Sequence, residues 1–277
     1  MARRSDVPRR RRLRAQVRAA LFLALWLPAV ALWLRSGLAV PPVPFMTDPL
    51  PMAAALTASA LCAAVGLAIS VQRYEVRTGR YLAWAAWALA LNQVTWAYLA
   101  LAERDASLPA AAGAAWLNSA VAFPAATAVI IALVAVFPTD HPASGAGRTA
   151  IVLASAAAGL VTLGSFLRPG PMPLITGYES PFGSAGMAAI GFTLQLLGWA
   201  ALVLASAIDA ASVLVRYRHA DAVTRAQLRV FMAVVMFTAV PFVLMIVTST
   251  LDLATPRLRD LISAVALAGV ALIPLAV

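Results

Sequence analysis

Few residues in this chain of 277 could carry acid–base or metal chemistry. Its two histidines, His141 and His219, lie in polar segments, and neither belongs to an H-E-x-x-H motif; no phosphate-binding glycine loop occurs either. A histidine could titrate near neutral pH, but such loop positions are usually only solvated. Cys62 is the only cysteine and lies in an apolar run, which excludes an intrachain disulfide and a cysteine metal cluster. We therefore predict no catalytic residue, no metal site and no cofactor.

Polar side chains inside apolar runs are the remaining candidates. Asp209 is the one acid in such a run, where a charge at mid-bilayer costs about 2.5 to 3.5 kcal/mol. Arg216 follows it by two helical turns on the same face. We favour a water-mediated pair of Asp209 with Arg216 or Arg218 over a sensing or proton role. The neutral polar residues in the apolar runs are Asn92, Gln93, Asn118 and Gln195. We expect each to form a hydrogen bond between helices, worth roughly 0.6 kcal/mol; the alternative is that several of them line an internal pocket.

The elements that position these residues are apolar segments. The chain is 62% hydrophobic and 12% charged, with a mean hydropathy of +0.87, whereas a soluble domain is about half apolar and a quarter charged. Runs near 20 residues can cross a hydrocarbon core of roughly 30 Å. The sequence predicts an all-α, polytopic transmembrane helix bundle of about eight spans, near residues 19–34, 51–71, 81–102, 114–137, 149–167, 187–215, 230–251 and 261–277.

Charge sets the expected orientation. All 21 basic residues are arginine, and the net charge of +10 would suggest a nucleic-acid partner in a soluble protein. Here sixteen arginines lie before the first span or in the connections after the second, fourth and sixth spans. The positive-inside rule then places both termini in the cytoplasm, where the anionic leaflet is the counter-charge. We predict that residues 1–18 form a disordered basic cytoplasmic arm and that residues 19–34 form a signal anchor that is retained.

Several stretches of the chain together resemble the multi-span N-terminal membrane region of sensor histidine kinases of the actinobacterial type. The turn RYRHADAVTRAQLR, residues 216–229, resembles the family's VVRYRRA and ER-QLRW, and VFPTDHPASGAGR resembles its inner loop LFPTGRLPSPRWR. The loop segments PGPM and SPFG resemble PGPL and NP-x-G. Asp140 and His141 depart from the pattern, which has Gly-Arg there.

The resemblance implies a membrane sensor or input domain that passes a stimulus to a cytoplasmic kinase. The chain stops inside the apolar run ALIPLAV, where family members continue, so we expect the kinase modules to be missing. This chain alone is therefore not expected to be an enzyme; whether it is a piece of a histidine kinase stays open. The candidate signalling turn comprises Arg216, Tyr217, Arg218, Arg225 and Arg229. The candidate inner-loop motif comprises Phe137, Pro138, Thr139, Asp140, His141 and Arg148.

Expected partners follow from the same interpretation. The lipid bilayer of a bacterial plasma membrane is the first, a homodimer is a candidate assembly, and no nucleic acid is expected. A kinase module or response regulator is a partner only if the full-length protein continues. Two alternatives stay open: a small multi-pass transporter or channel, disfavoured by the lack of a clear inverted repeat, and a structural membrane subunit.

Overall fold

The computed structural model describes residues 6–43, 46–72, 76–142, 144–172, 174–175, 177–250 and 255–276. Over these residues the fold is helical, and the one β pairing within them is an isolated bridge between Pro171 and Glu179. The predicted all-α architecture is confirmed. Long apolar stretches with few interior glycines and prolines satisfy their backbone groups internally as helices, which a lipid environment requires.

Eight long helical segments follow one another along the described chain, and each predicted apolar segment coincides with one of them. The third connection leads into a composite helix, in which a π-helical turn, η1, joins α4 to α5. The elements are α1 (Asp6–Arg35), α2 (Leu50–Gln72), α3 (Arg77–Ala102), α4 (Ala111–Trp116), η1 (Leu117–Ala122), α5 (Phe123–Val136), α6 (Gly145–Leu167), the short 3₁₀ helix η2 (Ala185–Met187), α7 (Ala188–His219), α8 (Ala222–Thr250) and α9 (Pro256–Ala276).

Seven of these segments are long and apolar enough to cross a membrane. The exception is α3, which has 26 residues but carries polar and aromatic side chains, including Asn92 and Gln93. Most residues of α3 are buried against neighbouring helices. The chain thus has the features of a multi-pass membrane protein. Helix α3, the one that does not meet the hydropathy criterion for a span, is largely buried by neighbouring helices.

The basic arm differs from the prediction. The sequence predicts disorder over residues 1–18; residues 1–5 lie outside the described part of the chain, and α1 begins at Asp6 and runs unbroken to Arg35. Arginine is among the better helix formers, and Pro8 lies in the first helical turn, where the missing N–H has no intrahelical partner to lose. The arginine-rich segment therefore extends the first apolar helix by several turns.

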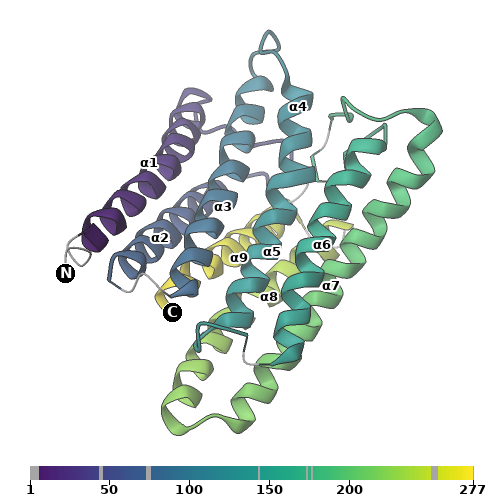
Figure 1. The fold of residues 1–277 in the computed structure, drawn as a ribbon. Coiled ribbons are helices and arrows are strands. Elements are labelled where there is room, and N and C mark those ends of the chain that lie inside the picture. The colour runs from purple at the N-terminus through teal and green to yellow at the C-terminus, as the bar shows by residue number, and fades with distance from the viewer. Residues whose placement is uncertain are drawn as a thin grey trace.

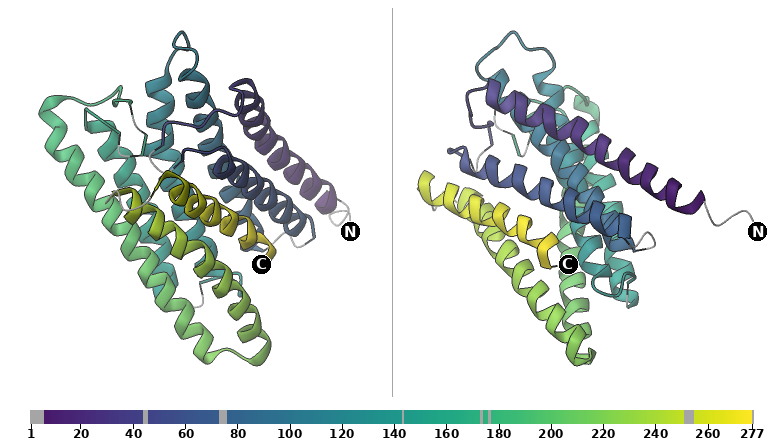
Figure 2. Two further views of the ribbon diagram at one scale, coloured as in Figure 1. Left: turned by 180° about the vertical axis from the view of Figure 1, so that it is seen from behind. Right: turned by 90° about the vertical axis from the view of Figure 1, so that its left-hand side faces the viewer.

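The helices pack in two rows that cross at an angle (Figures 1 and 2). One row contains α1, α2, α9 and α8, and the other contains α3, the composite helix of α4, η1 and α5, then α6 and α7. Helix α3 joins the rows, because α1 and α2 both pack on it. Large apolar side chains on α7 and α8 stay exposed, Val203 to 71%, as expected for lipid-facing surfaces.

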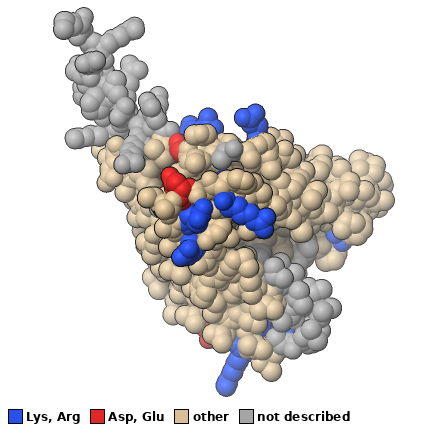
Figure 3. All heavy atoms as spheres, turned by 90° about the horizontal axis from the view of Figure 1, so that it is seen from below, with Lys and Arg blue, Asp and Glu red and all other residues tan. Residues whose placement is uncertain are grey.

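The two ends of the bundle differ in their connections. The C-termini of α2, α5 and α7 and the N-termini of α3, α6 and α8 gather at one end, which we call the basic end, and both described termini lie toward it (Figure 1). Figure 3 views this end and shows several separate groups of arginine atoms with few acidic atoms among them. The connection between α6 and α7 lies at the opposite end.

Glycines bring α6 and α7 into backbone contact. A Cβ built at Gly164 would lie 2.6 Å from the backbone nitrogen of Gln195, and one at Gly191 would lie 2.8 Å from the Gly164 oxygen. A Cβ at Gly198 would lie 2.8 Å from the Val161 nitrogen. Small residues allow such approach between membrane helices and give van der Waals packing that hydrophobic burial cannot supply in lipid. Alanines and Leu202 continue this interface toward the basic end.

Candidate functional site

Arg216 fastens the end of α7 to the end of α5. Its Nη1 donates to the carbonyl oxygen of Phe137, its Nη2 donates to the Val134 oxygen at 3.0 Å, and its Nε donates to the Ser212 oxygen at 3.4 Å. The last carbonyls of a helix have no intrahelical donor, and a cation there also complements the helix dipole. A half-buried guanidinium thus completes the C-terminus of α5.

Asp140 fastens the same connection to α3. Its Oδ1 accepts hydrogen bonds from the backbone N–H of Thr78 at 2.7 Å and from the Thr78 hydroxyl at 3.1 Å. Thr78 is the second residue of α3, where backbone N–H groups lack partners and negative charge is favourable. Asp140 therefore caps a helix that begins more than sixty residues earlier in the chain.

Two further contacts complete this region. The hydroxyls of Ser144 and Ser212 lie 3.0 Å apart and link the start of α6 to α7. The rings of Phe137 and Phe231 lie 4.3 Å apart between centroids, which joins the connection to α8. We call the set the basic-end junction; its residues are Thr78, Phe137, Asp140, Ser144, Ser212, Arg216 and Phe231. The junction thus joins the ends of α3, α5, α6 and α7 to one another and to the side of α8.

The inner-loop motif and the turn motif therefore meet in space, through the carbonyl oxygen of Phe137 and the guanidinium of Arg216. Tyr217 also packs against the apolar cluster that contains Phe231. The other motif residues lie around it: Pro138 is half-buried, whereas Thr139, His141, Arg148, Arg218, Arg225 and Arg229 are exposed. Arg225 donates to the Ala220 oxygen at 2.9 Å within the turn.

Asp221 begins α8 as its cap. Its Oδ1 accepts a hydrogen bond from the Thr224 backbone N–H at 2.7 Å. Hydrogen bonds from the backbone and the side chain of Thr224 hold the pKa of Asp221 below its ordinary value. The turn is thus ordered by a carboxylate at a helix N-terminus, which the sequence signals by an Asp three residues before Thr.

Asp209 lies on the buried face of α7, with only 2% of its surface exposed. Among the described residues, its Oδ1 has no hydrogen-bond partner. Arg216, two turns away, donates to carbonyl oxygens on α5 and α7 instead. A water-mediated pair between the two stays a prediction. A buried carboxylate oxygen without a protein partner is costly and is a common mark of a functional position.

The four amide residues lie at three separate places. Gln93 bridges α3 to α2, because its Nε2 donates to the Ala55 oxygen at 2.6 Å and its Oε1 accepts from the Ser59 hydroxyl at 2.8 Å. Asn118, in the π-helical turn, donates from Nδ2 to the Asn92 oxygen at 3.1 Å and to the Thr95 hydroxyl at 2.7 Å. These groups join neighbouring helices and do not gather around one cavity.

Gln195 belongs to a network at the opposite end. Its Oε1 accepts from Arg168 Nη1 at 2.8 Å, and its Nε2 donates to the Ser165 hydroxyl at 2.9 Å. The Ser165 oxygen accepts from the Trp116 indole at 3.2 Å. Arg168 also lies 5.1 Å from the centroid of the Phe192 ring. The sequence marks Arg168 only as the first polar residue after a span.

Sequence reasoning placed Ser144 in the inner-loop segment but gave it no contact, and it missed the other junction partners, Thr78, Ser212 and Phe231. Only Ser144 has a local signal, because it precedes a helix and accepts from the Gly147 N–H at 3.2 Å as an N-cap. Within the described residues, no cluster of three or more His, Cys, Asp or Glu side chains could hold a metal ion.

The contacts of the junction suit a structural role. It holds helix ends together through charge and hydrogen bonds, and its aromatic pair continues the apolar core. It joins a hydrogen-bonded set on α3, α5, α6 and α7 to an aromatic contact on α8. Comparison with protein-family models, with curated proteins and with solved structures finds no match to this chain.

Proposed function

We propose that this chain is an integral membrane sensor or input domain of the two-component type, with eight spans and both termini in the cytoplasm of a bacterium. The observation that carries the proposal is the contact of Arg216 with the carbonyl oxygens of Val134 and Phe137. It joins the two motifs on which the resemblance to sensor histidine kinases rests.

The junction supplies a route for a signal. Helices α7 and α8 contact each other sparsely beyond their shared turn, whereas α8 packs along α9. A shift of the α6–α7 pair therefore reaches α8 mainly through the turn and the Phe137–Phe231 contact. A stimulus drives such a shift only if it binds the two arrangements with different affinity. A cytoplasmic kinase module is the proposed receiver.

The kinase test uses the chain fused to the cytoplasmic half of a histidine kinase in proteoliposomes. Autophosphorylation is measured while external pH, osmolality and lipid composition are varied. We expect at least one condition to change the rate, and Arg216→Gln to remove that response. The matched control is Arg218→Gln, an exposed arginine of the same turn. A rate that ignores every condition, or a response that survives Arg216→Gln, refutes the proposal.

The topology is tested separately by cysteine labelling in a Cys62→Ala background. Arg77→Cys and His219→Cys should react with a membrane-impermeant maleimide only from the cytoplasmic side, and Ser107→Cys and Ser184→Cys only from outside. Arg77 is the first residue of α3 and Ser107 lies in the connection after its last residue, Ala102, so this pair decides whether α3 spans. Labelling of both from one side would reduce the topology to seven spans.

Asp209 favours one second candidate, a small transporter or channel. A buried carboxylate whose Oδ1 has no partner within the described parts of the chain suits proton or cation movement through a membrane. Proton uptake by proteoliposomes under an imposed potential tests this function. Uptake that Asp209→Asn abolishes would support transport, whereas uptake equal to that of protein-free vesicles would exclude proton transport.

A further inference from the structure

A cleft between α1, α2 and α3 lies apart from the basic-end junction. It holds about 240 Å³ and is bounded by twelve residues, of which only Arg18 and Ser70 are polar. Six alanines form much of the wall, and their small side chains leave space that larger residues would fill. Helix α1 packs more closely on α3 than on α2, which leaves the gap on the α2 side.

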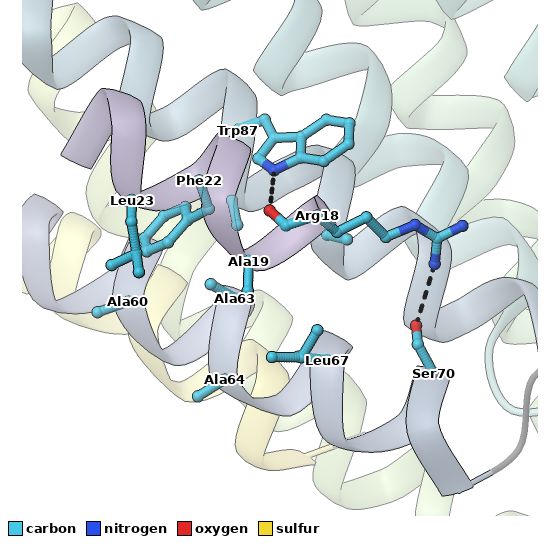
Figure 4. Close-up of a pocket in the computed structure, with 12 residues that line it drawn as sticks. Arg18, Ala19, Phe22, Leu23, Ala60, Ala63, Ala64, Leu67, Ser70 and Trp87 are labelled. Carbon is cyan, nitrogen blue, oxygen red and sulfur yellow. Dashed lines mark hydrogen bonds between the residues drawn. The ribbon is translucent and has the colours of Figure 1, made fainter. Parts of the chain in front are cut away.

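The cleft is polar at one end and apolar along the rest. Figure 4 shows Arg18 and Ser70 together at one end, with Phe22 and Leu23 of α1 beyond them, facing alanines of α2. Arg18 lies on the basic-end side of Phe22, because α1 enters the bundle from that end. The polar mouth thus lies at the end where the arginines gather, and the apolar part extends toward the middle of the bundle.

Contacts hold the mouth in place. Arg18 donates from Nη1 to the Ser70 hydroxyl at 3.3 Å, and the Trp87 indole donates to the Arg18 carbonyl oxygen at 3.3 Å. The first bond directs the guanidinium across to α2, and the second ties the backbone of α1 to α3. A positive charge is therefore positioned at the mouth by two different helices.

The geometry points to a binding site for one anionic phospholipid, with its phosphate at Arg18 and an acyl chain in the cleft. An apolar cavity excludes water, and in a bilayer the available apolar filler is a lipid chain. Basic pockets between membrane helices on the cytoplasmic side bind anionic headgroups. Arginine matches phosphate through its planar fork of donors.

The site uses none of the junction residues, and it shares with the proposed function only the orientation that places the basic end in the cytoplasm. It gives α1 a role beyond that of an anchor: the lipid would fill the space between α1 and α2.

The test uses the full chain in nanodiscs, with phosphatidylglycerol or phosphatidylcholine brominated on one acyl chain. Bromine quenches nearby indoles, so the difference between the protein and its Trp87→Phe variant isolates quenching of Trp87. We expect brominated phosphatidylglycerol to reach half-maximal quenching at about fivefold lower mole fraction than brominated phosphatidylcholine, the effect of one basic residue. Equal half-maximal mole fractions for the two lipids refute the proposal.

Two variants sharpen the result. Arg18→Gln should remove the preference for phosphatidylglycerol, whereas Arg148→Gln, an exposed arginine at the same end but outside the cleft, should keep it. Ala64→Leu should narrow the cleft and reduce quenching by both lipids, while the lipid-facing Ala156→Leu should not. A preference that survives Arg18→Gln overturns the assignment of the headgroup. Unchanged quenching in Ala64→Leu overturns the assignment of the chain.

The final experiment adds inorganic phosphate as a competitor. It should leave the quenching by brominated phosphatidylglycerol unchanged, because the free ion lacks the chain that fills the cleft. Displacement of the lipid by phosphate at millimolar concentration would mean that the mouth binds the anion alone, and would contradict the lipid assignment.

Discussion

Arg216 on α7 donates a hydrogen bond to the carbonyl oxygen of Phe137, 79 positions earlier in the chain, and thereby completes the C-terminus of α5. Replacing it by glutamine removes the charge and leaves terminal carbonyls of α5 without their cationic donor. Hydrogen bonds to charged groups contribute about 1.5 to 3 kcal/mol. We expect Arg216→Gln to lower the free energy of unfolding in detergent by about that amount.

The control for this change is Arg218→Gln, because Arg218 is exposed on the same helix end. It should shift the unfolding free energy by less than about 0.5 kcal/mol, as most exposed substitutions do. Equal destabilisation by the two variants would show that net charge at this end, and not the bond to α5, carries the effect. Denaturant titration followed by circular dichroism measures both.

Gly191 should be intolerant of any side chain. The Cβ of an alanine there would lie 2.7 Å from the Arg168 nitrogen and 2.8 Å from the Gly164 oxygen, both backbone atoms. Overpacking of this kind costs about 1 to 3 kcal/mol, so Gly191→Ala should destabilise by that amount. Gly159→Ala, on α6 with nothing within 4 Å of its Cβ, should be neutral or stabilising because alanine favours helix. A neutral Gly191→Ala would contradict the close packing.

The Asn92–Asn118 contact can be measured by a double-mutant cycle. Asn118 donates to the backbone and side-chain oxygens of Asn92 at 3.1 and 3.2 Å. Such bonds between membrane helices average about 0.6 kcal/mol and reach about 1.7. We expect a coupling energy in that range between Asn92→Ala and Asn118→Ala. Additive effects of the two changes would mean that the side-chain bond contributes nothing.

Tyr178 should ionise later than an ordinary tyrosine. Burial and its hydrogen bond to Glu103, 3.0 Å between the hydroxyl and Oε1, raise the pKa of Tyr178 to about 12. Because the folded pKa lies above the unfolded value near 10, this contribution to stability is complete below about pH 10 and is lost as pH rises toward 12.

Ultraviolet titration of tyrosinate checks this, with the Tyr178→Phe variant subtracted to isolate the one group. Glu103→Gln removes the neighbouring negative charge and should move the transition back toward pH 10. A transition of Tyr178 near pH 10 in the unaltered protein would contradict the burial and the bond.

The positions of the helices could be predicted because lipid leaves few choices: runs near 20 apolar residues between polar turns become helices. The arm at residues 6–18 was mispredicted because the absence of apolar periodicity says nothing about the helix propensity of arginine. The status of α3 as a span is weaker for a related reason. Asn92 and Gln93 lower its hydropathy, and their partners Asn118 and Ser59 come from distant segments.

The candidate site was likewise predictable only in part. The arginine-rich turn at residues 216–229 and the proline-containing segment around Phe137 were both recognised as motifs. Their contact with each other could not be predicted. Nothing in the segment around Phe137 specifies that Arg216 donates to its carbonyl, since any guanidinium could serve a helix end. Likewise, Thr78, Ser144 and Ser212 are ordinary small polar residues until the fold places them 2.7 to 3.1 Å from their partners.

The backbone contact of α6 with α7 has a consequence for motion. Two helices whose glycines touch cannot slide past each other without a clash, so the pair resembles a stiff rod, with α7 about 48 Å long at 1.5 Å per residue. Arg168 and Gln195 lie toward one end of the rod, and Ser212 and Arg216 lie at the other. A small tilt imposed on the connection between α6 and α7 would therefore reach the basic end of the bundle as a lateral displacement of the helix ends there.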